Sequence, residues 1–373
     1  MTAFSSKPDP VSRQAGGPIR VVTVDDSVFM RRALKTMLEA PGITVVGSAT
    51  NGEEGIAEVA RLRPDVVTLD IEMPVMDGLT ALRKIRSAID PAPAVLVCSS
   101  LTSAGSHEAL KALRLGAADV IAKDSSTFSL SATKIRDELL AKVRAIAQGR
   151  TASVDTHAAA APARIDASHR LNPQNTDVVV IGSSTGGPPV LEAILSALPA
   201  NFPAPIVVAQ HMPLMFTKSL AERLSGMCKI AVQHAEHRMS LRAGTAYIGP
   251  GGSHTRVIRA GLGKLGVEVS GEPADALYKP CVNELYSSAA RVCGGRSVAV
   301  ILTGMGDDGM LGAKDLRAKG ATILAQDMQS CVVYGMPRAV AQAGLADGSM
   351  PPKDIASVPA SMPCRRISSS RRR

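Results

Sequence analysis

Tryptophan is absent from this chain of 373 residues and aromatic residues make up only 2% of it, so its cores must consist of aliphatic side chains and Met. Hydrophobic residues still contribute 45% and charged residues 20%, the balance of an ordinary globular protein with room for two domains. No apolar run approaches the ~18 residues that a membrane span needs, and the polar N-terminus lacks the apolar middle of a signal peptide. We therefore expect a cytoplasmic protein without a transmembrane segment.

Disulfide and metal-site spacings are also missing. The six Cys residues form no C-x-x-C pair and no disulfide-scaffold spacing, so we interpret most of them as small buried side chains. His234 and His237 stand three positions apart but lack a Cys partner or a second ligand pair. This pattern favours an exposed surface pair over a metal site.

The net charge of +9 requires that nucleic-acid binding be considered. Five Arg residues lie in the last ten positions, CRRISSSRRR, and the remainder contains no basic helix with interleaved aromatic residues. We interpret the excess as a solvated basic tail and predict no nucleic-acid partner.

Five strand-like runs alternate with helical patterns in the first part of the chain. The runs are 19–26, 44–50, 65–70, 94–100 and 119–124. This alternation predicts right-handed crossovers and a parallel sheet, and five such units predict a flavodoxin-like, doubly wound α/β domain. A helix over 130–147 is expected to close it, while residues 1–18 are expected to be disordered.

The composition then changes. Residues 148–175 are rich in Ala, Thr, Pro and Gln and predict a linker with some helix at its start. A second, Rossmann-like α/β domain is predicted from buried strand patterns at 177–184, 204–211, 244–250, 298–304 and 321–327. A β-hairpin is expected within 255–271, and the tail from about 351 is expected to be loose. We place the two domains at 19–140 and 177–350, with 141–176 between them.

Complementary side chains stand at the ends of the first set of strands. Asp25 and Asp26 end the first strand, Asp70 the third, Ser99 the fourth and Lys123 the fifth. Carboxyl ends of parallel strands meet at one edge, and three carboxylates together favour a divalent cation such as Mg²⁺. Lys and a hydroxyl would hold a phosphoryl group on one carboxylate. A single such Asp is usually a turn or cap residue, but four strand ends argue against that alternative.

The motifs DDS and LDIEMPVMDG, with the later Ser and Lys, resemble the receiver domain of two-component response regulators. The resemblance implies that a histidine kinase phosphorylates Asp70, and that Asp25, Asp26 and Asp70 bind Mg²⁺. It also implies that Ser99 is the switch hydroxyl and Lys123 the phosphate partner. Receivers commonly have Pro after this Lys. Position 124 is Asp in this chain, so a cis peptide is not expected there and phosphate affinity is expected to be weaker.

A second set of strand ends predicts a serine hydrolase. The segment 182–186 fits G-x-S-x-G in a strand, sharp turn and helix, which lifts a Ser hydroxyl above the sheet. His211 follows the next apolar strand, and Asp307 and Asp308 follow a later one. A serine needs a base and the base an orienting acid. The chain order of Ser, His and Asp differs from that of ordinary α/β-hydrolases.

Each element has an ordinary alternative. The GSSTGG turn can be a phosphate or dinucleotide loop, although it lacks G-x-G-x-x-G. His211 can be a core histidine, and the Asp pair can cap the following helix. Their joint occurrence in three strand-end loops favours a catalytic triad.

The motifs GSSTGGP, QHMP, YIGPGGSH, ILTGMGDDG and SCVVYGMPRAV closely resemble the protein-glutamate methylesterase domain of chemotaxis. The resemblance implies Ser184 as nucleophile, His211 as base and Asp308 as orienting acid. Ser183 stands where the family usually has Ala, and Asp307 stands at a more variable position. The family also implies deamidation of glutamine by the same triad.

Asn283 replaces an acid that is common in this family. A receiver, a linker and this hydrolase domain, in this order, form the family's full architecture.

The predicted reaction is a two-step acyl transfer that needs no cofactor for hydrolysis. Backbone N–H groups near Thr185 or Met305 are expected to form an oxyanion hole, simple packing being the alternative for Met305. The resemblance implies methyl-accepting chemotaxis receptors as substrates and a chemotaxis histidine kinase as phosphodonor. We expect the unphosphorylated receiver to cover the hydrolase opening and phosphorylation to loosen that contact.

Two other classes of function remain as alternatives. One is a phosphorylation-dependent interaction protein with a vestigial hydrolase site, against which the intact Ser, His and Asp set argues. The other is a receiver-linked DNA-binding regulator, which would need a helix-turn-helix where residues 178–198 instead predict strand, turn and helix.

Overall fold

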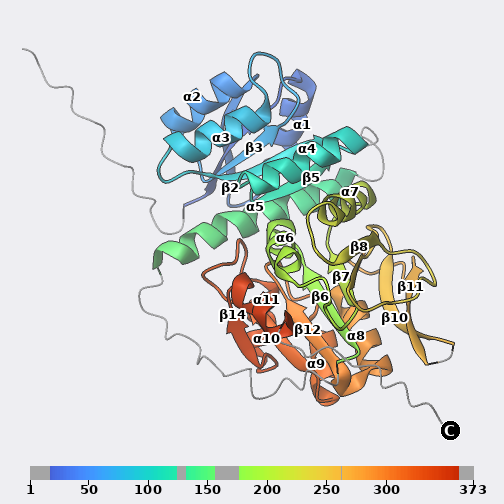
Figure 1. Cartoon of the computed structure of the whole chain (residues 1–373). Helices are drawn as coiled ribbons and strands as arrows, with labels where there is room; N and C mark the ends of the chain where they lie inside the picture. Colours follow the sequence, from blue (N-terminus) through green and yellow to red (C-terminus); the bar gives the residue numbers. More distant parts are fainter. Residues whose placement is uncertain (1–16, 124–131, 156–175, 262, 361–373) are drawn as a thin grey trace, which may run out of the picture.

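The computed structural model describes residues 17–123, 132–155, 176–261 and 263–360 (Figure 1). The predictions for residues 1–16, for the backbone at position 124, for most of the linker and for the basic tail lie outside these residues. Among the described residues, no helix is both long enough and apolar enough to cross a membrane.

The N-terminal domain is a five-stranded parallel sheet in the order β2-β1-β3-β4-β5. Its elements are β1 (Ile19–Val24), α1 (Val28–Leu38), β2 (Ile43–Ala49), α2 (Gly52–Leu62), β3 (Val66–Asp70), α3 (Gly78–Ala88), β4 (Ala94–Ser100), α4 (Ser103–Arg114), β5 (Asp119–Lys123) and α5 (Ala132–Asp155). This strand order is flavodoxin-like, so the predicted doubly wound fold is confirmed. The side chains of Asn51, Asp77 and Thr102 accept hydrogen bonds from the first turns of α2, α3 and α4, fixing where each helix begins.

The second domain is a seven-stranded parallel sheet in the order β14-β13-β12-β6-β7-β9-β8, with a separate hairpin of β10 and β11. Its elements are β6 (Val178–Ser183), α6 (Gly187–Ala197), β7 (Ile206–Gln210), α7 (Leu214–Ser225), β8 (Ala231–His234), β9 (Thr245–Ile248), β10 (His254–Ala260), β11 (Lys264–Ser270), α8 (Val282–Val292), β12 (Ser297–Ile301), α9 (Met310–Ala318), β13 (Thr322–Gln326), α10 (Met336–Gln342), β14 (Gly348–Met350) and α11 (Pro352–Ala360). The predicted Rossmann-like α/β class and the hairpin are confirmed.

Both faces of this second sheet are buried, as the central strand shows. Val179 and Ile181 of β6 belong to the apolar cluster that contains α6, α7 and α11. Val178 and Val180 belong to the cluster that contains α8, α9 and α10. Alternate residues of one strand therefore pack against helices on opposite faces of the sheet. The loops that follow the carboxyl ends of the strands stay available to form a site at that edge.

The expectation of a loose tail from about residue 351 is wrong for α11. Ile355 is fully buried and packs into the same cluster as α6. Pro351 and Pro352 stand at the start of this helix, where a missing N–H costs nothing. The edge strands β8 and β14, of four and three residues, were too short to be predicted.

Helix α5 lies between the two domains (Figure 1). It continues to Asp155, beyond the helix expected over 130–147. Leu139, Val143 and Ile146 pack in the receiver core, and Val333 of the hydrolase domain joins the same cluster. We therefore propose that the receiver's core extends past residue 140, the limit predicted from sequence.

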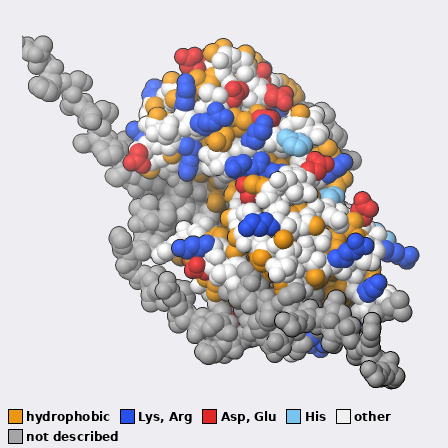
Figure 2. Space-filling view, in the orientation of Figure 1, with side chains coloured by type: hydrophobic (Ala, Val, Ile, Leu, Met, Phe, Trp, Pro, Cys, Tyr) orange, Lys and Arg blue, Asp and Glu red, His pale blue; other side chains and the backbone are white. Residues whose placement is uncertain are grey.

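The two domains share a continuous apolar interface. Helix α4 packs against α7 and α6, and residues of both domains form one buried cluster. At the edge of this interface, Arg114 Nε lies 3.3 Å from Glu192 Oε1. On the face shown in Figure 2, basic and acidic side chains lie among one another over the receiver rather than forming a patch of one sign.

The His234 and His237 pair is only partly as predicted. His237 is exposed, but His234 is half-buried and its Nε2 lies 3.2 Å from Thr217 Oγ1. Within the described residues all five Cys side chains are free thiols. Two of them, Cys98 and Cys293, are buried, while Cys228, Cys281 and Cys331 are half-buried.

Candidate phosphorylation site and candidate active site

Acidic side chains converge at the carboxyl edge of the receiver sheet. Asp25 and Asp70 are buried, whereas Asp26 is exposed. A ligand oxygen of each of these three residues lies within 4.8 Å of the other two. Lys123 Nζ lies 2.7 Å from Asp25 Oδ2 and 2.7 Å from Asp70 Oδ2. The structure thus brings together four of the residues predicted for this edge.

The charges of this cluster are incompletely balanced. Burial raises the pKa of Asp70; Lys123 opposes this shift and the negative charge of Asp25 adds to it, so the pKa stays above its ordinary value. Burial alone would lower the pKa of Lys123, but the two carboxylates raise it above its ordinary value. Three carboxylates and one ammonium form an oxygen-rich, negative donor set of the kind that Mg²⁺ prefers, so Asp25, Asp26 and Asp70 fit this cation.

Ser99, predicted as the switch hydroxyl, does not contact Asp70 in this structure. Its buried Oγ donates a hydrogen bond to the carbonyl oxygen of Gly105, at 2.9 Å. Gly105 lies in the first turn of α4, the helix that packs against the hydrolase domain. At the end of the fourth strand, the Ser99 hydroxyl therefore binds the helix that forms the domain interface and not the acidic cluster.

The strand register places Ser184 and His211 side by side. Strands β6 and β7 pair in parallel with Ser183 opposite Gln210, so the next residue of each strand leaves the sheet at the same level. The N–H of His211 donates to Ser183 O at 3.0 Å, and Gln210 Nε2 donates to Ser184 O at 2.9 Å. The two predicted residues therefore start from a rigid, hydrogen-bonded base.

Two glycines make the turn after Ser184 feasible. Gly186 has a φ of 77°, in the left-handed region that glycine adopts at no steric cost, and α6 begins directly after it. Gly304, from the loop after β12, packs so closely that an added Cβ would lie 2.7 Å from Ser184 Cβ. The three loops predicted to meet above the sheet do so in this way.

The two serines of the motif differ in environment. Ser183 is fully buried, and its hydroxyl donates to Gln210 Oε1 at 2.6 Å. Ser184 keeps 8% of its surface exposed. The hydroxyl of Ser183 is therefore committed to the core, which favours Ser184 as the reacting group.

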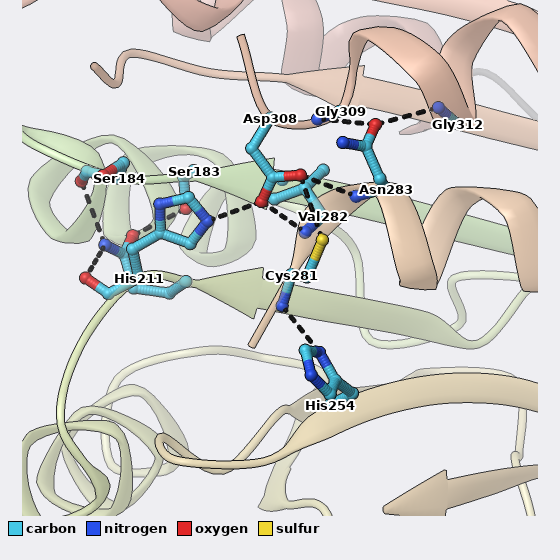
Figure 3. A network of polar contacts seen from close by, with 12 residues as sticks. Ser183, Ser184, His211, His254, Cys281, Val282, Asn283, Asp308, Gly309 and Gly312 are labelled. Carbon is cyan, nitrogen blue, oxygen red and sulfur yellow. Dashed lines mark hydrogen bonds and ion pairs between the residues drawn. The ribbon is translucent and has the colours of Figure 1, made fainter. Parts of the chain in front are cut away.

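Asp308 belongs to the loop between β12 and α9. Its carboxylate lies against the N-terminus of α8 and contacts His211 there (Figure 3). Its Oδ2 lies 2.8 Å from His211 Nε2 and accepts the N–H of Val282 at 2.7 Å. Its Oδ1 accepts the N–H of Asn283 at 2.9 Å and the thiol of Cys281 at 3.2 Å. A helix N-terminus favours an anion, because its first N–H groups lack partners within the helix.

These contacts keep Asp308 ionised. Burial would raise the pKa of Asp308, but the hydrogen bond and charge of His211 and the two backbone N–H groups outweigh it, so the pKa lies below its ordinary value. On the other side of the imidazole, His211 Nδ1 is buried and has no hydrogen-bond partner among the described residues. The imidazole thus offers one nitrogen to Asp308 and keeps the other available.

One family model, CheB methylesterase, matches residues 179–358, and another, the response regulator receiver domain, matches residues 21–133. A protein-glutamate methylesterase/protein-glutamine glutaminase of Oleidesulfovibrio alaskensis is 51% identical over 362 residues, covering 91% of this chain and 97% of that protein. The chain belongs to the CheB methylesterase family.

Two further proteins are similar to this chain. A protein-glutamate methylesterase/protein-glutamine glutaminase of Nitratidesulfovibrio vulgaris is 48% identical over 360 residues, covering 91% of this chain and 97% of that protein. The solved catalytic domain of Thermotoga maritima CheB methylesterase is 41% identical, covers 50% of this chain and 99% of that chain, and aligns with a TM-score of 0.49.

Several residues of the methylesterase domain were not predicted from sequence. The ring of Tyr278 stacks on the imidazole of His211, with centroids 4.3 Å apart and planes inclined by 11°. Asn283 Oδ1 accepts the N–H groups of Gly309 at 3.0 Å and Gly312 at 2.9 Å, so the amide does the accepting that an acid would do there. In the sequence, Asn283 was notable only because it replaces an acid that is common in the family. Tyr278 lies in none of the motifs recognised in the sequence.

The predicted oxyanion-hole residues both lie at the domain interface. Thr185 is buried, and its hydroxyl donates to Asp119 Oδ2 of the receiver at 2.6 Å. Met305 packs against the cluster formed by α5 and the receiver sheet. Lys142 of α5 completes the contact, with Nζ 2.8 Å from Asp119 Oδ2. Asp119 begins β5, so a rule that looks for function at carboxyl strand ends passes over it.

Proposed function

We propose that this chain hydrolyses glutamate methyl esters, and deamidates glutamines, on methyl-accepting chemotaxis receptors, with Ser184 as nucleophile, His211 as base and Asp308 as orienting acid. The observation that carries the proposal is the His211–Asp308 pair beside the Ser184 turn. The names of the relatives support the substrate class, because both are protein-glutamate methylesterases/protein-glutamine glutaminases.

The first step is attack by Ser184 on the γ-carbonyl of the modified glutamate. Asp308 accepts the proton on His211 Nε2 in their hydrogen bond, which leaves Nδ1 as the basic nitrogen that removes the Ser184 proton. The resulting imidazolium returns this proton to the leaving group. Methanol leaves from a methyl ester, or ammonia from a glutamine, and a glutamyl ester of Ser184 remains.

The second step reverses these roles with water. His211 takes a proton from water, the hydroxide attacks the acyl-enzyme carbonyl, and Ser184 leaves with the proton to release the glutamate carboxylate. Among the described residues, no hydrogen bond uses the N–H groups of Thr185 and Met305, which supports them as oxyanion donors. One such donor typically contributes roughly 10²–10³ in rate.

We also propose control by phosphorylation of Asp70 by a chemotaxis histidine kinase. Asp25, Asp26 and Asp70 would hold Mg²⁺, which supplies positive charge against the phosphoryl oxygens. The receiver strand β5 supports a direct route to the hydrolase. Its last residue, Lys123, contacts Asp70, and its first, Asp119, contacts Thr185 next to the nucleophile. The two ends are about 13 Å apart at ~3.3 Å per residue.

Asp119 contacts a charged group as well as Thr185, because the ammonium group of Lys142 lies 2.8 Å from its carboxylate. Burial alone would lower the pKa of Lys142, but Asp119 and Glu138 raise it above its ordinary value. Thr185 thus donates to a carboxylate that also pairs with the ammonium group of Lys142. We propose that this arrangement, with α4 packed on α6 and α7, covers the site in the unphosphorylated form and loosens on phosphorylation.

Methanol release from methylated receptor, with and without a small-molecule phosphodonor and Mg²⁺, tests the proposal. We expect Ser184→Ala to lower the rate by at least about 10³-fold, because it removes the nucleophile of the triad. We expect Ser183→Ala to keep most of the rate. Asp70→Asn should retain the basal rate and lose the stimulation. Full activity of Ser184→Ala would reject Ser184 as the nucleophile. A parent chain that releases no methanol would reject the hydrolase assignment and leave a phosphorylation-dependent interaction protein.

A further inference from the structure

Among the described residues, the imidazole of His211 is held by a single side-chain hydrogen bond. Its Nε2 is bound to Asp308, and its Nδ1 has no hydrogen-bond partner among the described residues. This one hydrogen bond does not by itself fix the plane of the ring. The stacked ring of Tyr278, inclined by only 11°, lies across one face and opposes that rotation.

We infer that Tyr278 is a positioning residue for this reaction: its ring holds His211 with Nε2 toward Asp308, and it stabilises the imidazolium that forms when His211 takes the Ser184 proton. The inference rests on the function proposed above. An aromatic face attracts a cation, so the contact strengthens as positive charge develops on the imidazole. Such a contact acts on the transition state more than on the ground state and is expressed in kcat.

The loop that carries Tyr278 is anchored on both sides. The carbonyl of Lys279 accepts the N–H of Gly252 at 3.1 Å, and Lys279 Nζ donates to Gly271 O at 2.9 Å. The N–H of Cys281 donates to Nδ1 of the buried His254 at 3.3 Å. The stacking ring therefore stands on a fixed segment.

These anchors also explain the YIGPGGSH motif, none of whose residues takes part in the proposed reaction. Gly251 packs so tightly that an added Cβ would lie 2.2 Å from Met212 O, one residue after His211. Gly252 and His254 hold the Tyr278 loop. The motif thus sets the distance between the backbone of the base and the ring that stacks on it.

The phenol of Tyr278 is poorly suited to proton transfer. Burial, followed by the charges of Asp308 and Asp307, raises its pKa above the ordinary tyrosine value, so the group stays protonated at neutral pH. The ring face, and not the hydroxyl, makes the contact with His211.

The test uses the full-length chain with phosphodonor and compares Tyr278→Leu with the matched control Tyr278→Phe, which keeps the ring. We expect Tyr278→Leu to lower kcat for methanol release about tenfold with KM nearly unchanged, within the range of a half-desolvated cation–π contact. The acidic limb of its kcat–pH profile should move to lower pH, since the imidazolium loses a stabilising partner. Tyr278→Phe should match the parent in all three quantities.

A double-mutant cycle separates this role from general stability. In an Asp308→Asn background the imidazole is already misoriented, so Tyr278→Leu should cost clearly less than in the parent. Unchanged kcat and pH profile in Tyr278→Leu would overturn the inference, and so would a Phe variant as slow as the Leu variant. Absence of methanol release by the parent chain would instead reject the underlying function, so the two failures are distinguishable.

Discussion

Asp70 and Asp308 are both buried aspartates at the carboxyl edge of a parallel sheet, and each contacts a basic side chain, yet their pKa values shift in opposite directions. Burial raises the pKa of Asp70, whereas the partners of Asp308 lower its pKa in spite of burial. The two domains therefore use one residue type in one topological position for different chemistry.

The difference follows from the neighbours of each carboxylate. Asp70 accepts one backbone N–H, from Ile71 at 2.7 Å, and shares Lys123 with Asp25. Asp308 accepts two backbone N–H groups at the start of α8 as well as the contact with His211. An under-neutralised carboxylate suits a site that recruits a cation and a phosphoryl group. A fully satisfied one suits a residue that must stay ionised while its partner cycles.

The largest expected effect comes from removing the charge of Asp308. Asp308→Asn should lower kcat by about 10⁴-fold, because the amide favours the wrong imidazole tautomer. It would also direct an NH₂ group at backbone N–H donors. Asp307→Asn is the matched control, and methanol release measures both. If the two variants are equally and mildly impaired, neither residue orients His211.

The second prediction concerns the contact that joins the two sites. Asp119→Asn should raise the basal rate of the unphosphorylated enzyme roughly 5- to 10-fold, because exchanging a hydrogen bond to a charged group for one to a neutral amide loses about 1 kcal/mol. The ratio of stimulated to basal rate should fall. Arg114→Gln removes the exposed interface pair with Glu192, leaves Glu192 paired with Arg223, and is the control. An unchanged basal rate in Asp119→Asn would show that the Thr185 contact does not restrain the site.

The third prediction compares the two aspartates as stability determinants. Between the ordinary Asp pKa and the raised pKa of folded Asp70, the folded state binds more protons, so this group's contribution falls as pH rises. Asp70→Asn should therefore raise the thermal midpoint at pH 7 by roughly 2–4 °C. The contribution of Asp308 has the opposite sign: it is present above the unfolded pKa and is lost as pH falls through the folded one. Asp308→Asn should lower the midpoint.

Thermal unfolding with and without Mg²⁺ checks both changes. Mg²⁺ should raise the midpoint of the parent chain and of Asp308→Asn, but much less that of Asp70→Asn, which has lost a ligand. A midpoint of Asp70→Asn below that of the parent without Mg²⁺ would mean that the pair with Lys123 outweighs the cost of burying the carboxylate.

The sequence predicted both folds and the strand-end side chains, because alternating strands and helices constrain where carboxyl ends meet. Such periodicity carries no information on side-chain direction, and Ser99 accordingly points to Gly105 and not to Asp70. It carries none on contacts between domains, so Asp119 was missed. Tyr278 lies in an irregular loop, where the contact with His211 depends on tertiary packing alone.

The smallest expected effect on kcat comes from removing the weakest hydrogen-bond donor to Asp308, the thiol of Cys281. The Cys281 thiol is a weak donor at 3.2 Å, and burial, followed by the charge of Asp308, raises its pKa to about 12. It therefore stays protonated through any assay range. Cys281→Ser keeps a hydrogen-bond donor and should leave kcat within about twofold of the parent. Cys281→Ala leaves Asp308 with three partners and should lower kcat roughly 2- to 5-fold, the lower range for the loss of one hydrogen bond. Equal rates for Ser and Ala would mean that the backbone N–H groups and His211 suffice to hold the carboxylate, and that the thiol only fills space.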